Sequence, residues 1–286
     1  MEKMIAKHFV PFVLLLCSAT IRAAHTSHQP SQNPFEKKQF VLVHGAGHGA
    51  WCWYKIATLL TAAGHNVTAL DMAASGIDPK QVQQIHSLVN YYEPLIKLMA
   101  SLQPHDRVIL VGHSMGGIPI SLAMEWFPHK IAAAVFATAA MPGLAISLAT
   151  ISKEFNRDTD FMDTQYGIDE GSDKPATAMF FGPKFLASSM YQLSPLEDLT
   201  LALTLVRWTP LFRDELVLTK EKYGSVPRVF IMCDQDRSIK PDLQSLMINK
   251  NPPDEVKVIN GSDHMVMFSR TLELFSNLHQ IAQKYS

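Results

Sequence analysis

This chain has few cysteines and almost no net charge, and each of these two features excludes a class of protein. The sequence has 286 residues but only 3 cysteines, too few for the framework of a small disulfide-stabilised fold. Its cysteines and histidines do not show the spacing of metal ligands, so we expect no metal site. Positive and negative side chains nearly cancel, and a formal net charge of -1 provides no electrostatic basis for binding nucleic acid.

The chain also lacks an apolar run long enough to span a bilayer. The N-terminal run Phe9–Cys17 follows two lysines and precedes several small residues, which is typical of a secretory signal peptide. We therefore expect a signal peptide over residues 1–24, a flexible leader over 25–38, and a secretory or extracellular protein with no stable membrane insertion after signal removal. In that compartment the sequons at Asn66 and Asn260 would be acceptors for glycans.

The most informative segment is a Gly-x-Ser-x-Gly motif that lies between a strand and a helix. Residues 108–111 are apolar and typical of a buried strand, residues 112–116 are Gly-His-Ser-Met-Gly, and an apolar helical pattern covers 118–127. A nucleophile elbow requires this context, because the sharp turn presents the serine above the edge of a sheet. The motif therefore predicts that Ser114 is a nucleophile. The structural alternative is a glycine-rich turn with a solvated serine.

Two later loops lie where the acid and the base of such a site are expected. In an α/β-hydrolase the acid follows the serine along the chain and the histidine comes last, each after a strand. Residues 228–232 and 255–259 have the pattern of buried strands, and they precede Asp236 and His264 respectively. We favour Asp236 over Asp234 because it lies further beyond the strand end, where its carboxylate can turn back toward the imidazole. Asp234 would then brace its own loop.

A glycine-rich loop after the first expected strand, 39–43, is the predicted oxyanion hole. Its glycines allow backbone N–H groups to turn inward, and we expect the amides of Ala46 and Met115 to be the two donors. The loop, 44–50, does not match a dinucleotide fingerprint, because its third glycine comes too early. Nucleotide binding is therefore not expected.

The remaining pattern predicts a single α/β-hydrolase domain over 39–286. Strands alternate with helices, which indicates a mostly parallel sheet with helices on both faces. The further strands are expected at 66–70 and 131–138, and the further helices at 50–63, 88–102 and 271–284. Between about 141 and 225 the alternation stops, and we expect a cap inserted over the active site.

Apolar side chains of the cap, together with the residue after the histidine, are predicted to line the substrate pocket. They are Phe161, Met162, Phe181, Trp208, Leu211 and Met265, with Phe180, Met190 and Leu193 as further candidates. An apolar, covered site suits a small hydrophobic acyl group. For any one of these residues the alternative is packing of the cap onto the core, and the same apolar surface could serve a homodimer.

The chain also resembles the plant methylesterase family of α/β-hydrolases, which includes salicylate-binding methyl esterases, methyl jasmonate esterases and polyneuridine aldehyde esterase. The stretches that carry the resemblance are 40–51, 64–76, 108–117, 179–187 and 263–265. The resemblance implies Ser114, Asp236 and His264 as a catalytic triad, with the Ala46 and Met115 amides as the oxyanion hole. Family members usually begin close to the first strand, so the resemblance implies a cytoplasmic location as the alternative to secretion.

The predicted function is hydrolysis of methyl esters of small hydrophobic plant metabolites or hormones, of salicylate, jasmonate, indole acetate or terpenoid-alkaloid type, without a cofactor. Hydroxynitrile lyases, close relatives in this family, have a lysine directly after the catalytic histidine and a threonine in the oxyanion loop. This chain has Met265 and Gly45-Ala46 at those places, and methionine offers no charge to a cyanide leaving group. A ligand-binding, hormone receptor-like hydrolase with little turnover is a rival hypothesis, and a long-chain lipase is less favoured.

Overall fold

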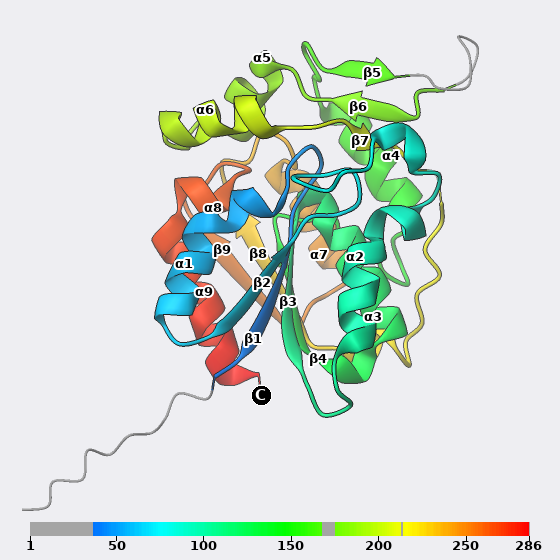
Figure 1. The fold of residues 1–286 in the computed structure, drawn as a ribbon, viewed down its shortest axis with the longest axis vertical. Coiled ribbons are helices and arrows are strands. Elements are labelled where there is room, and N and C mark those ends of the chain that lie inside the picture. Colours follow the sequence, from blue (N-terminus) through cyan, green and yellow to red (C-terminus); the bar gives the residue numbers. More distant parts are fainter. Residues whose placement is uncertain (1–36, 168–174, 213, 286) are drawn as a thin grey trace, which may run out of the picture. The chain divides into compact units, whose positions relative to one another are not determined.

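Six parallel strands form the central sheet of the computed structural model, which describes residues 37–167, 175–212 and 214–285 (Figure 1). In order across the sheet they are β2 (Asn66–Leu70), β1 (Gln39–Val43), β3 (Val108–His113), β4 (Ile131–Ala137), β8 (Arg228–Cys233) and β9 (Glu255–Ile259). The predicted parallel α/β sheet is confirmed, and β3 runs two residues beyond the apolar stretch, up to the nucleophile. The predicted signal peptide and most of the leader lie outside the described residues. Within the described ranges, no helix has both the length and the hydrophobicity to cross a membrane.

Both faces of the inner strands are buried, which explains why β1, β3 and β4 are nearly continuous hydrophobic runs. Along β1, Val41 and Val43 belong to one core cluster, whereas Phe40 and Leu42 belong to the other. All four side chains are fully buried. Burial of each such side chain stabilises the fold by roughly 1.5–3 kcal/mol relative to exposure.

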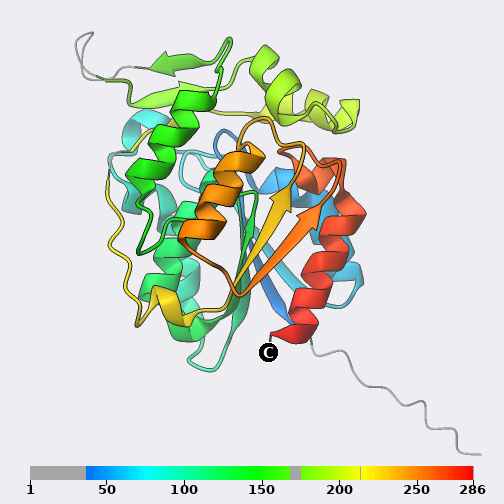
Figure 2. The ribbon, with the colours of Figure 1, turned by 180° about the vertical axis from the view of Figure 1, so that it is seen from behind.

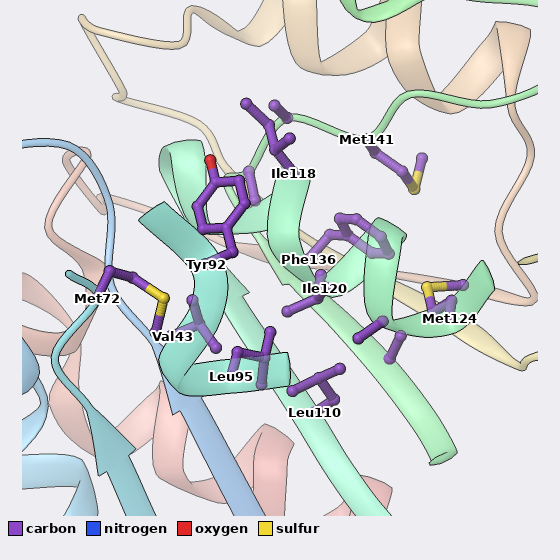
Figure 3. Packing of buried hydrophobic residues seen from close by; sticks show 14 of the residues in the cluster. Val43, Met72, Tyr92, Leu95, Leu110, Ile118, Ile120, Met124, Phe136 and Met141 are labelled. Atoms are coloured by element: carbon purple, nitrogen blue, oxygen red, sulfur yellow. The ribbon is translucent and has the colours of Figure 1, made fainter. Parts of the chain in front are cut away.

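Helices cover the two faces in two groups, as the opposite views in Figures 1 and 2 show. The first group packs on the cluster that contains Val41 and comprises α2 (Leu88–Ser101), α3 (Gly117–Trp126) and α7 (Pro241–Lys250). The second group packs on the cluster that contains Phe40 and comprises α1 (Tyr54–Ala62), α8 (Val266–Ser269) and α9 (Thr271–Lys284). Figure 3 shows Leu95 of α2 and Ile120 of α3 against Leu110 and Phe136 of the sheet.

Of two helices expected in the first half of the domain, one is divided at its start and the other begins where expected. The helix expected over 50–63 is divided into a 3-10 turn, η1 (Ala50–Trp53), and α1. The helix expected over 88–102 is intact although Pro94 lies inside it. Its N-cap is Ser87, whose hydroxyl accepts a hydrogen bond from the amide of Asn90, which satisfies one of the free donors of the first turn.

The chain between β4 and β8, which includes the region expected to form a cap, has a different architecture. It contains a small antiparallel sheet of order β5-β6-β7 and several short helices. The elements are α4 (Leu148–Asp158), β5 (Gln165–Gly167), β6 (Ala178–Phe180), α5 (Pro183–Phe185), η5 (Leu186–Met190), α6 (Leu196–Leu205) and β7 (Thr209–Pro210). In Figure 1 the antiparallel sheet, α5 and α6 lie beyond the carboxyl ends of the central strands. Residues at those strand ends therefore face this part of the chain, and we refer to the described residues from α4 to β7 as the cap.

Candidate active site

Ser114 lies in a sharp turn between β3 and α3. Its φ of 54° is in the left-handed region, which is strained for a residue with a side chain. The turn is possible because glycines flank it: a Cβ on Gly112 would lie 2.5 Å from the carbonyl oxygen of Gly116, and a Cβ on Gly116 would lie 2.6 Å from that of Val43. Ser114 is only half-buried, so its hydroxyl is within reach of a ligand.

A chain of hydrogen bonds joins Ser114 to a histidine and a carboxylate. The Oγ of Ser114 lies 2.9 Å from Nε2 of His264, and Nδ1 of His264 lies 2.7 Å from Oδ2 of Asp236. With Nδ1–H donating to the carboxylate, Nε2 of the neutral ring is free to accept the serine proton. The three residues come from loops after β3, β9 and β8, because the carboxyl ends of parallel strands meet at one edge of the sheet.

Asp236, rather than Asp234, is the carboxylate that contacts His264. The Oδ1 of Asp236 accepts hydrogen bonds from the amides of Ser238 at 2.7 Å and Ile239 at 2.9 Å, and its Oδ2 accepts one from the hydroxyl of Thr138 at 2.5 Å. Asp234 instead accepts a hydrogen bond from the amide of Gly261 at 2.6 Å and so braces the loop that carries the histidine.

Thr138 is a residue that sequence reasoning missed. It follows β4 directly, is fully buried and has a φ of 39°, so its hydroxyl is directed at Asp236 by an unusual backbone conformation. Its position as a polar residue at a strand end was the available signal. Several of the central strands end near the site, so this signal does not show which strand end lies beside Asp236. Only the strand order places the end of β4 beside β8.

The glycine-rich loop after β1 lies against the nucleophile. A Cβ on Gly45 would lie 2.7 Å from the Cβ of Ser114, so only glycine fits there without displacement. The carbonyl of Gly45 accepts a hydrogen bond from Nδ1 of His44 at 2.8 Å, and the amide of Met72 donates to Nε2 of the same ring at 3.1 Å. Ala46 follows Gly45 and Met115 follows Ser114 along the chain, so the two residues predicted as oxyanion donors border the contact between the loop and the serine.

Three buried histidines around Ser114 are held neutral and support the backbone. Burial lowers the pKa of His44 and of His113, and it lowers the pKa of His48 to about 3. His113 donates from Nε2 to the carbonyl of His264 at 2.8 Å, and its ring lies 4.7 Å from the His264 ring. His113 therefore orients the backbone of the candidate base, in keeping with the structural role expected from its position beside the serine.

The residues predicted to line a pocket lie in two different environments. Phe181 is buried over the oxyanion loop, where a Cβ on Gly47 would lie 3.1 Å from its ring, and Met265 is fully buried beside His264. Phe161 is half-buried and stacks on Phe185 with ring centroids 5.7 Å apart. Phe181 thus contacts the glycine-rich loop, and Met265 directly follows His264 along the chain.

The remaining pocket candidates lie further out in the cap. Met162 and Leu193 are exposed, at 46% and 49% respectively. Trp208 packs on Phe180 with ring centroids 5.6 Å apart, and Leu211 is half-buried beside the small antiparallel sheet. Their place in the substrate pocket therefore stays a prediction.

Neither a metal-ligand cluster nor a reactive thiol is found among the described residues. No cluster of three or more His, Cys, Asp or Glu residues there could hold a metal ion. Cys52 and Cys233 are buried free thiols, and burial raises the pKa of each well above its ordinary value. The groups that hydrogen bonds join at the site are a serine hydroxyl, an imidazole and a carboxylate.

The chain is similar to known proteins over most of its length. The model of the alpha/beta hydrolase family matches residues 40–277. Methyl jasmonate esterase 1 of Vitis vinifera is 53% identical over 257 residues, which cover 87% of this chain and 98% of that relative. Salicylic acid-binding protein 2 of Nicotiana tabacum is 46% identical and covers 88% of this chain and 99% of its own length. The crystal structure of tomato methylketone synthase I complexed with 2-tridecanone has a TM-score of 0.83 at 49% identity, covering 87% of this chain and 99% of its own.

Proposed function

This chain belongs to the alpha/beta hydrolase family, and we propose that it is a serine esterase that hydrolyses methyl esters of small hydrophobic plant metabolites. The observation that carries the proposal is the unbroken hydrogen-bond relay from Ser114 through His264 to Asp236. Relatives named as esterases or methylesterases, 45–53% identical over most of this chain, support a carboxylic ester hydrolase.

The proposed reaction proceeds through an acyl-enzyme. Nε2 of His264 accepts the proton of Ser114 while Oγ attacks the ester carbonyl carbon, and Asp236 stabilises the imidazolium that forms. The amides of Ala46 and Met115 donate to the oxyanion of the tetrahedral intermediate, and each such donor contributes on the order of 3 kcal/mol. Collapse of the intermediate breaks the C–O bond, and the imidazolium protonates the leaving methoxide to give methanol. Water, deprotonated by His264, then attacks the acyl-enzyme and releases the acid and the serine.

The names of the relatives suggest which acyl groups to test first. The relative at 53% identity is named for methyl jasmonate, and the relative at 46% is named for salicylic acid. Both acids are small and largely apolar, which suits a site beneath aromatic side chains such as Phe181. We propose methyl jasmonate as the first substrate and methyl salicylate as the second.

The test is release of acid and methanol from methyl jasmonate, methyl salicylate and methyl indole acetate by the wild-type protein and by Ser114→Ala. We expect repeated turnover that the substitution abolishes. A single round of binding without turnover would instead support a receptor-like protein. Because a methylketone synthase that matches at 49% identity is also seen in complex with β-ketoheptanoate, this β-keto acid is included in the panel. Its decarboxylation in the absence of ester hydrolysis would overturn the esterase proposal.

We also propose that the chain enters the secretory pathway, on the basis of the N-terminal apolar run. Mass spectrometry of the mature protein from plant cells tests this proposal. Removal of about the first 24 residues supports it, and a mature chain that begins at Met1 contradicts it.

A further inference from the structure

The peptide group that follows the Ala46 amide is held at both of its ends. Its carbonyl, that of Ala46, accepts a hydrogen bond from Nδ1 of His48 at 2.8 Å. Its N–H, that of Gly47, donates to the hydroxyl oxygen of Thr209 at 2.5 Å. Gly47 has a φ of 73°, so this fixed peptide is part of a turn that few other residues could adopt.

Thr209 belongs to the cap, not to the sheet that carries the relay. It is the first residue of β7 and is 1% exposed. The amide of the nearby Arg207 donates to the carbonyl of Gly47 at 2.9 Å, so the peptides on both sides of Gly47 contact the same cap segment.

The guanidinium group of Arg207 fixes that cap segment to the core. It donates to the carbonyls of Gly76 at 3.1 Å, Asp78 at 2.6 Å and Lys80 at 2.8 Å. These three carbonyls belong to the loop after β2, so Arg207 joins the cap to the sheet beside the oxyanion loop. Thr209 is therefore held in place independently of its own contact with Gly47.

A second cap residue acts on the same peptide through His48. Because Nδ1 of His48 donates to a carbonyl and the buried ring is neutral, its Nε2 is an acceptor. The hydroxyl of Tyr191 donates to this nitrogen at 2.7 Å, and the Tyr191 and His48 rings stack with centroids 5.9 Å apart. Tyr191 is 2% exposed, so this hydrogen bond is shielded from water.

We propose that Thr209 and Tyr191 are positioning residues, through which the cap sets the orientation of the Ala46 amide toward the developing oxyanion. The inference rests on the proposed function of Ser114 and the oxyanion loop. A lid that only covered the substrate would not need hydrogen bonds to the backbone of the loop. Here Thr209 of the cap accepts a hydrogen bond from the N–H of Gly47, and Tyr191 of the cap contacts His48, which donates to the carbonyl of Ala46. Misplacing such a donor by about 1 Å is enough to reduce the rate roughly 100-fold.

The test uses Thr209→Val, which removes the acceptor with little change in shape, and Thr209→Ser, which retains it. Tyr191→Phe removes only the hydroxyl that donates to His48. Matched controls are Thr200→Val, at an exposed site on the cap helix α6, and Tyr92→Phe, which removes a buried hydroxyl without a hydrogen-bond partner among the described residues. Circular dichroism melting establishes that each variant is folded.

Two readouts separate the inference from the proposed function. The first is hydrogen–deuterium exchange of a peptide spanning residues 44–50, which does not depend on turnover. We expect faster exchange in Thr209→Val than in the wild type, Thr209→Ser or Thr200→Val, because the Gly47 amide has lost its acceptor. Unchanged exchange in a folded Thr209→Val protein would overturn the inference even if the enzyme is an esterase.

The second readout is hydrolysis of p-nitrophenyl acetate. We expect kcat to fall roughly tenfold to 100-fold in Thr209→Val and Tyr191→Phe with little change in KM, and to recover in Thr209→Ser. A rise in KM alone would identify a substrate-contact role and overturn the inference. Absence of turnover in the wild type would count against the proposed function, and the exchange measurement would still decide whether the cap holds the loop.

Discussion

The central sheet and the cap differ in how they hold a residue in place. In the sheet, strands such as β3 and β4 are fully buried, and their side chains are packed in the cores on both faces. In the cap, the strands β5, β6 and β7 have only two or three residues each, and β5 is largely exposed. The reactive groups lie at the ends of sheet strands, whereas the cap acts through single hydrogen bonds. Substitutions at the ends of the sheet strands should therefore abolish most of kcat, and substitutions in the cap should reduce kcat only in part.

Asp236→Asn should have the largest effect, because it changes the carboxylate that orients His264. We expect kcat to fall by about 10⁴-fold, since an amide favours the wrong imidazole tautomer. The matched control is Asp234→Asn in the same loop, where the side chain only braces Gly261. Steady-state kinetics with methyl jasmonate checks both variants. Equal losses in the two would contradict the assignment of the acid.

The stability of the core should fall in acid because His48 is buried and neutral. Burial lowers its pKa to about 3 from an ordinary value of 6.5. Below pH 6.5 the unfolded chain binds a proton at His48 that the folded chain does not bind until about pH 3. As the pH falls from 6.5 to about 3, His48 should therefore lower the free energy of unfolding by up to about 1.4 kcal/mol per pH unit. Above pH 6.5, His48 should not make the free energy of unfolding depend on pH.

Urea unfolding at pH 7, 6 and 5 measures this dependence, and His48→Gln should make it less steep. His86→Gln, at an exposed position, is the control and should leave the dependence as in the wild type. If His48→Gln has the same pH dependence as the wild type, His48 is not the neutral buried group described here.

Thr138→Val should have a smaller effect on catalysis than Asp236→Asn, because it removes one of four hydrogen bonds to that carboxylate. We expect kcat to fall roughly tenfold, the equivalent of one charged hydrogen bond. Valine retains the β-branch at this left-handed position, so the backbone strain is matched. Thr138→Ser should restore most of the rate, and a serine variant as slow as the valine variant would exclude the hydroxyl as the cause.

Phe181→Leu should have the smallest effect and should change selectivity rather than rate. Its ring lies over Gly47, so a smaller side chain would leave room for a bulkier acyl group. We expect the ratio of kcat/KM for methyl jasmonate to that for methyl salicylate to change about tenfold. Met162→Leu, at a position that is 46% exposed, is the control. A change of equal size in the control would place the acyl group further out in the cap.

The sheet and its relay could be predicted from the sequence because their signals are local. Buried parallel strands are continuous apolar runs, and a Gly-x-Ser-x-Gly turn between a strand and a helix has few other structural explanations. The order of strands in the fold then gives the places of Asp236 and His264 along the chain. Asp236 and Asp234 could be ranked only by their distance from the strand end, and the contact with His264 distinguishes them.

The contacts of the cap could not be predicted in the same way. Thr209 and Gly47 are 162 residues apart, and nothing in a threonine next to a proline indicates which amide it accepts from. Strands of two or three residues are too short to show a periodic pattern. For the same reason the sequence could predict pocket-lining residues of the cap only as a group. Which individual side chains line the pocket could not be predicted, and two of the candidates, Met162 and Leu193, are exposed.

Stoichiometric labelling of the serine tests the central claim most directly. The protein is incubated with a p-nitrophenyl alkylphosphonate, which transfers its phosphonyl group to an activated serine and releases p-nitrophenol. Peptide mass spectrometry then locates the added mass. The account predicts one label per chain, on Ser114, with rapid release of one equivalent of p-nitrophenol and strongly reduced labelling in Asp236→Asn. A folded wild-type protein that is not labelled, or that is labelled at another residue, would contradict it.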